Sequence, residues 1–242
     1  ASPSPDRRWR CSPAGPAHLV FMVRLPAAPP PAALASRAEY AADAAVHAVG
    51  LLAGGLACLG LVLALPDEAG RRSAAAFGLY AAGLLAMLGC SALYNLARPG
   101  QWRRILQRFD HAAIFLMIAG TYTPVALLAI GGGWGWALFA TVWAGALCGA
   151  LLKLLAPARI ERAAILLYLL LGWVGLLAIG PLLQSLPVAD LLLLLLGGML
   201  YSLGVRVHLA TTLRFHTAIW HGLVLAAAAC HYTVVLHLAA AD

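Results

Sequence analysis

A set of ionisable and hydrogen-bonding side chains stands out because it interrupts long apolar stretches of this sequence. Carboxylates, imidazoles, hydroxyls and amides can exchange hydrogen bonds or protons, and some of them can bind a metal ion. The members are Glu39, Asp43, His47, Ser91, Asn95, Asp110, His111, His216, Thr217 and His221. Burying such groups among apolar residues is costly, so each one needs a structural or functional reason.

The spacing of these residues places several of them on common helix faces. Glu39, Asp43 and His47 recur every four residues, and Ser91 and Asn95 have the same spacing. Residues four apart lie on one face of an α-helix. We therefore expect each group to project from its helix in one direction.

The two histidines near position 220 do not share a helix face. His216 and His221 are five residues apart, which turns them about 140° from each other on a regular helix. They would not chelate one ion together. Thr217 and His221 are four apart and share a face.

The elements that carry these residues are apolar segments long enough to cross a bilayer. Of the 242 residues, 63% are hydrophobic and 10% are charged, whereas an ordinary soluble domain has about 25% charged residues. A bilayer-spanning helix needs about 20 mainly apolar residues. Such segments occur at about 42–65, 73–96, 109–130, 134–155, 163–183, 189–209 and 216–239. The predicted fold is an all-α bundle of seven transmembrane helices.

Arginine and lysine indicate the orientation of this bundle. With the N-terminus in the cytoplasm, 14 of the 16 basic residues lie on the inner side, and only Arg71 and Arg72 lie outside. Inner loops carry the excess of basic residues in membrane proteins. We therefore expect a multi-pass protein of the cell (plasma or inner) membrane, with its C-terminus outside. The net charge of +7 then reflects topology, and we expect no nucleic-acid partner.

The chain is expected to have two parts. Residues 1–37 contain 8 of the 14 prolines and five arginines, which is typical of a disordered segment. We interpret them as a cytoplasmic tail, followed by the transmembrane domain at 38–242.

This topology places the polar residues in one layer. The first, second, third and seventh helices all bring theirs to the cytoplasmic side. Helix rotation is not determined by sequence, so the layer does not establish that the side chains face one another. The alternative is that they only hydrogen-bond helix ends or extend to lipid headgroups.

Several stretches resemble the hemolysin III branch of the progestin and adipoQ receptor family. The resemblance covers nearly all of the chain from residue 39 onward, in the family's order. The matching stretches are 39–47 (EYAADAAVH), 91–95 (SALYN), 108–124 (RFDHAAIFLMIAGTYTP), 197–204 (GGMLYSLG), 218–225 (AIWHGLVL) and 231–232 (HY).

The resemblance implies seven helices, an inward N-terminus and a zinc site in the inner leaflet. The family's usual ligands are three histidines, one ending the helix 2 motif and two spaced four apart on helix 7, while a helix 3 aspartate contacts the ion through water. His221 matches the second helix 7 histidine, and Asp110 matches the aspartate. Asp110 and Ser91 are the candidate catalytic residues.

Two positions depart from this pattern. Asn95 and Thr217 stand where two of the three histidines belong, and neutral amide and hydroxyl groups are poor replacements for imidazole at zinc. His216 or His47 could compensate, with Glu39, Asp43 and His111 as supporting polar groups. We expect a weakened, rearranged or absent zinc site.

Three functions follow as hypotheses. The first is a receptor-like, regulatory or lipid-sensing protein with a polar cavity at the cytoplasmic leaflet, whose partners are membrane lipids or a lipid ligand. An alternative is a zinc-dependent, ceramidase-like hydrolase of a lipid amide. A third is the pore or cytolytic activity in the family's name, although a pore needs polar residues along the whole span.

Overall fold

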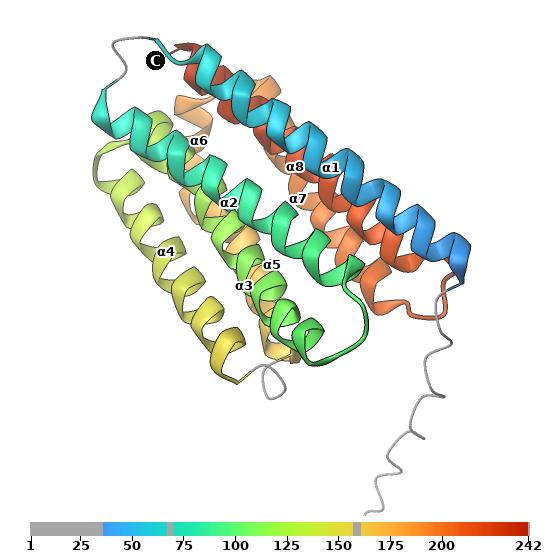
Figure 1. The fold of residues 1–242 in the computed structure, drawn as a ribbon. Helices are drawn as coiled ribbons and strands as arrows, with labels where there is room; N and C mark the ends of the chain where they lie inside the picture. Colours follow the sequence, from blue (N-terminus) through green and yellow to red (C-terminus); the bar gives the residue numbers. More distant parts are fainter. Residues whose placement is uncertain (1–35, 67–69, 157–160, 242) are drawn as a thin grey trace, which may run out of the picture. The chain divides into compact units, whose positions relative to one another are not determined.

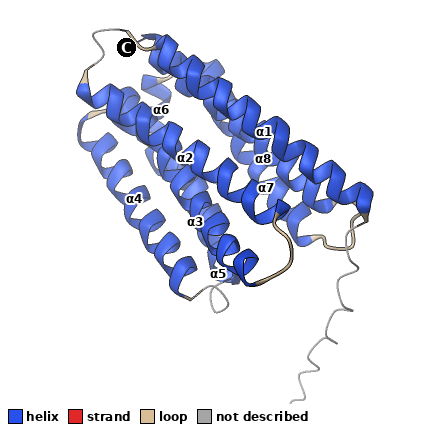
Figure 2. Ribbon diagram, viewed as in Figure 1, coloured by secondary structure: helices blue, strands red, loops and turns tan. Residues whose placement is uncertain are grey.

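Seven helical passages make up the described part of the chain. The computed structural model describes residues 36–66, 70–156 and 161–241, and all regular structure in these ranges is helical (Figure 2). The predicted tail lies almost entirely outside them. Each passage is long and apolar enough to span a membrane, which confirms the predicted fold. The orientation across the membrane remains a prediction.

The passages alternate in direction through the bundle (Figure 1). Two of them are composite, because α3 continues as a π-helical segment and α5 reaches α6 through a 3-10 segment. The elements are α1 (Arg37–Ala64), α2 (Arg71–Leu96), α3 (Gln101–Pro124), η1 (Val125–Ile130), α4 (Gly132–Leu155), α5 (Glu161–Trp173), η3 (Val174–Ala178), α6 (Ile179–Ser185), α7 (Val188–Leu209) and α8 (His216–Ala241).

Two helices begin earlier than their apolar segments predict. α1 begins at Arg37 because Ser36 and Glu39 form a capping box, in which each side chain accepts a hydrogen bond from the other residue's backbone amide. α3 begins at Gln101 and includes polar turns before the apolar stretch. Apolar run length therefore underestimates a helix that continues beyond the membrane core.

The fifth passage is interrupted where a tyrosine from α3 reaches its backbone. The Tyr122 hydroxyl donates to the Gly172 carbonyl at 2.7 Å and accepts from the Gly175 amide at 3.0 Å. These bonds satisfy backbone groups at the change to 3-10 geometry. Irregular backbone at membrane depth is tolerated where the protein itself provides such partners.

α3 lies at the centre of the bundle. Its most apolar window is 61% buried, against 17–44% in the other passages. Phe115 on α3 packs with Val142 and Ala146 of α4, while Met117 packs in a second cluster with residues of α1, α2 and α8.

Two glycines allow α2 and α3 to approach closely. A Cβ at Gly83 would lie 3.0 Å from the Leu116 carbonyl oxygen, and one at Gly120 would lie 2.9 Å from the Leu79 carbonyl oxygen. Small residues permit this backbone contact between membrane helices. The contact sets the rotation of both helices, and hence the direction in which Ser91 and Asp110 point.

Candidate metal centre

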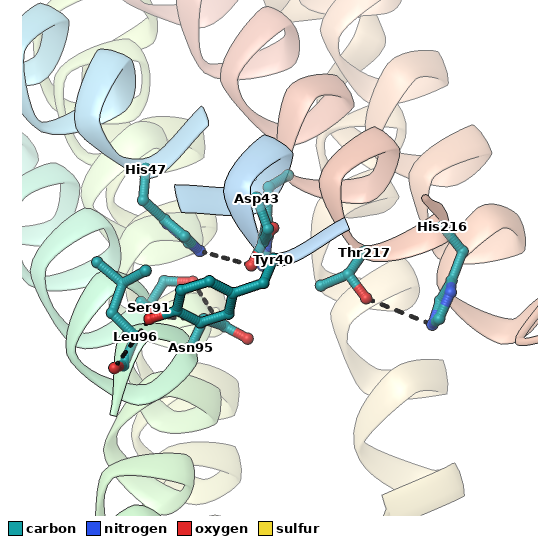
Figure 3. A network of polar contacts seen from close by, with 9 residues as sticks. Tyr40, Asp43, His47, Ser91, Asn95, Leu96, His216 and Thr217 are labelled. Carbon is teal, nitrogen blue, oxygen red and sulfur yellow. Dashed lines mark hydrogen bonds and ion pairs between the residues drawn. The ribbon is translucent and has the colours of Figure 1, made fainter. Parts of the chain in front are cut away.

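Three buried side chains from the two ends of the folded chain meet between α1 and α8. His221 Nδ1 lies 2.6 Å from Asp43 Oδ1, and His47 Nε2 lies 3.5 Å from Asp43 Oδ2. The two imidazole rings are 4.4 Å apart between centroids and tilted by 52°. Figure 3 shows His47 and Asp43 directed toward each other from successive turns of α1.

These side chains form the one group of three or more potential ligands found among the described residues. One donor atom from each of Asp43, His47 and His221 lies within 4.8 Å of the other two. All three residues are less than a tenth exposed. Two imidazoles and a carboxylate are a donor set that zinc accepts, with a fourth position left for water or substrate.

The Nε2 atom of His47 tests whether these residues fit a metal ion. His47 Nε2 is buried and has no hydrogen-bond partner, and Asp43 Oδ2 lies 3.5 Å away. A buried polar atom without a partner is rare in native proteins and calls for an explanation. A metal ion coordinated by Nε2 would satisfy it, so the residues present fit the implied metal.

The contact between His221 and Asp43 also fits this interpretation. When His221 donates its Nδ1–H to the carboxylate, the Nε2 lone pair remains available to a metal ion. A carboxylate that orients a ligating imidazole in this way is a common feature of metal sites.

Asp110 lies beside this group on α3. Its carboxyl group is buried and interacts electrostatically with His221, His47 and the Ser91 side chain. The structure therefore brings the candidate catalytic pair to the same end of the bundle as the three potential ligands.

Asn95 and Thr217, which occupy the positions of two family histidines, contact neighbours on their own helices and not the three-residue group. The Asn95 amide donates to the Ser91 carbonyl at 3.0 Å on its own helix. The Thr217 hydroxyl lies 3.4 Å from His216 Nε2, and Figure 3 shows these two side chains turned toward each other. Neither residue, nor His216, belongs to the three-residue group.

The backbone just before α8 is irregular, which was the condition for His216 to replace a missing ligand. Phe215 has a left-handed backbone conformation, with φ at 61°, so the chain bends sharply just before α8. His216 is nevertheless the first residue of a regular helix. The irregular geometry precedes it and does not bring it to His221's face.

Glu39 and His111 lie outside the three-residue group and make contacts elsewhere in the fold. Glu39 Oε1 accepts a hydrogen bond from the Phe215 amide at 3.2 Å, which joins the beginning of α1 to the bend before α8. His111 packs edge-on against Tyr94, with ring centroids 6.5 Å apart. Its carbonyl accepts a hydrogen bond from the Tyr168 hydroxyl.

Sequence reasoning assigned Asp43 only a supporting role, whereas the structure makes it the link between the two histidines. Its spacing of four residues from His47 was the available signal. The spacing shows that the two residues share a face, but not that the face turns toward α8.

Comparison with known proteins decides the family. The family model described as "Haemolysin-III related" matches residues 41–232. The chain belongs to the haemolysin-III related family. No solved structure matches it significantly.

Two haemolysin-III relatives show how far the similarity extends. Hemolysin-3 of Bacillus cereus is 33% identical over 198 residues, which are 82% of this chain and 90% of the relative. The Hemolysin-3 homolog of Bacillus subtilis (strain 168) is also 33% identical over 198 residues, covering 82% and 93%. Family membership and the seven apolar passages together make this haemolysin-III related chain a multi-pass integral membrane protein.

Proposed function

We propose that this protein is a zinc-dependent hydrolase that cleaves an amide bond of a membrane lipid. The observation that carries the proposal is the convergence of Asp43, His47 and His221 at one end of the bundle. We assign these three residues to the metal. The proposal replaces the family's two missing histidines with two residues of α1.

The chemistry divides between the metal and the chain. Zinc supplies Lewis acidity, because it polarises a carbonyl and lowers the pKa of water to about 7. In the proposal, Asp110 orients the attacking water and accepts its proton. In the proposal, the Ser91 hydroxyl orients the Asp110 carboxylate. The proton on Asp110 is then available to the leaving amine.

The position of the site supports a lipid substrate. The group lies in the first turns of α1 and α8, near one end of helices that span the bilayer. Amide bonds of lipids lie at this depth, between headgroup and acyl chains. The surrounding helices expose large apolar side chains, including Leu93 and Phe109, along which a lipid can approach.

A second candidate is a receptor-like or lipid-sensing protein without catalysis. The observation that favours it is the direct contact between Asp43 and His221, which joins α1 to α8. A lipid that separates these residues would change the packing of the two helices. This candidate requires neither zinc nor Asp110.

The name of the Bacillus relatives suggests lysis of cells as a third function. The bundle supports this function least. Phe77, Leu84, Met117 and Val235 fill the region between α2, α3 and α8, and a conduction path would need polar groups there.

Zinc content separates the first two candidates. The full chain, purified in detergent after growth with zinc, should contain about one zinc ion per molecule. His47→Ala and His221→Ala should lose it, and both should lose hydrolysis of a fluorescent ceramide analogue. His216→Ala and Thr217→Ala are the matched controls and should retain both properties.

Several outcomes would contradict the hydrolase. Wild-type protein without zinc would remove it and leave the sensing candidate. Zinc that persists in His47→Ala but disappears in His216→Ala would assign the metal to a different set of residues. Zinc with no amide hydrolysis would restrict the metal to a structural role.

A further inference from the structure

A basic pocket lies beside the link between α2 and α3, at the same end of the bundle as the candidate metal centre. Its volume is about 210 Å³, and its lining comprises Tyr94, Pro99, Gly100, Arg103, Arg104 and Gln107. The lining contains two guanidinium groups and no acidic side chain. This space accommodates several water-sized groups, and therefore a phosphate.

One of the two arginines is held in place by the pocket wall. The Arg103 guanidinium carbon lies 4.5 Å from the centroid of the Tyr94 ring, which is a favourable cation–π contact. A cation–π contact uses the charge of the guanidinium and does not require its N–H groups to hydrogen-bond. Planar guanidinium groups bind phosphate through paired hydrogen bonds.

Other groups around the pocket also favour an anion. The Gln107 side chain adds an amide donor. α3 begins here after Gly100, and no side chain caps its first turn. The free N–H groups and the helix dipole therefore add positive potential to that of the arginines.

The flanks of the pocket indicate which anion it meets. Trp102 is 77% exposed, and Leu93 on α2 and Phe109 on α3, each close in sequence to a lining residue, are also exposed. Exposed tryptophan at the end of a membrane helix marks the headgroup level. Basic pockets at this level between transmembrane helices bind the headgroups of anionic lipids.

We propose that this pocket binds the phosphate of an anionic phospholipid, with Arg103 and Arg104 as its ligands and with the acyl chains against the apolar flanks. The chemistry recognised is a phosphate ester, which free phosphate shares in part. The proposal is independent of the proposed hydrolase, because it uses none of the metal-binding residues.

Native mass spectrometry of the full chain in detergent tests the proposal. The probes are phosphatidylglycerol, phosphatidylcholine with the same acyl chains, and inorganic phosphate. Wild-type protein should bind phosphatidylglycerol about tenfold more tightly than phosphatidylcholine. Millimolar inorganic phosphate should leave this binding nearly unchanged.

The variants distinguish the pocket from general positive charge. Arg103→Gln with Arg104→Gln should weaken phosphatidylglycerol binding by at least about tenfold. The matched control is Arg98→Gln, which removes the same charge from the same link but not from the lining. It should retain wild-type affinity. Arg104→Gln alone, at an exposed position, should give an intermediate loss even if the double variant does not fold.

Three results would overturn the proposal. Equal affinity for the two lipids would show that the headgroup charge is not recognised. A loss in Arg98→Gln as large as in Arg104→Gln would show that only net charge acts. Displacement of phosphatidylglycerol by millimolar inorganic phosphate would show that the pocket is a site for the free anion.

Discussion

The Nδ1 atom of His221 lies 2.6 Å from Oδ1 of Asp43, although the two residues are 178 positions apart in the chain. The contact joins the first helix to the last near their beginnings. Both side chains are buried, so little water competes for it. The packing of α1 against α8 at this end of the bundle therefore includes a buried polar pair.

Removing Asp43 should destabilise the metal-free protein. Asp43→Ala leaves the buried His221 imidazole without its acceptor, and breaking a buried pair in this way costs about 3 kcal/mol or more. Reversible unfolding in mixed micelles with a chelator measures the change. His216→Ala is the control and should change stability by less than about 0.5 kcal/mol.

A double-mutant cycle isolates the contact itself. The effects of Asp43→Ala and His221→Ala should fall short of additivity by more than about 0.5 kcal/mol, since each variant already removes the shared bond. Additive losses would show that the two residues do not interact in solution.

Asp110→Asn should separate metal binding from catalysis. If the proposed hydrolase is correct, this variant retains zinc but cannot accept the proton from water, so turnover should fall about 100-fold or more. Ser91→Ala should cause a smaller loss, because the proposed role of Ser91 is only to orient Asp110, and Ser91 itself takes no proton. Zinc analysis and a ceramide-analogue assay measure the two properties, and undiminished turnover in Asp110→Asn would exclude it as the base.

The close approach of α2 and α3 should tolerate no larger residue. A methyl group in Gly120→Ala would press on the Leu79 carbonyl, and such overpacking costs about 1–3 kcal/mol. Gly89→Ala on α2 is the control, because a Cβ there meets nothing within 4 Å. Its stability should be unchanged or slightly higher. Equal effects of the two substitutions on the unfolding free energy would argue against the tight helix contact.

Gly197→Ala should be partly rescued by a second substitution. A Cβ at Gly197 would collide with the imidazole of His231, whose Nε2 contacts the Leu194 carbonyl at 3.2 Å. We expect the single variant to lower thermal stability and His231→Ala to restore part of it in the double variant. Full rescue is not expected, because the Ala227 carbonyl also lies 3.2 Å from the added Cβ. No rescue at all would show that His231 is not the obstacle.

The sequence predicted the depth of the polar residues along their helices better than the direction in which their side chains point. Helical rise converts residue number into height, so residue numbers alone assign Ser91, Asp110 and His221 to one layer. The sequence also showed that Asn95 and Thr217 replace two expected imidazoles. It did not show that both side chains bond to neighbours in their own helices.

The sequence by itself determined the seven passages and the end at which their polar groups gather, because run length and helical rise are local properties. The tertiary structure decided which of those groups meet. Helix rotation depends on contacts between distant segments, such as Gly83 and Gly120 against the opposite backbones. The packing of α1 against α8 brings Asp43 and His47 to His221, while Thr217 lies beside His216. A candidate metal centre that is incomplete on α2 and α8 is therefore completed from α1.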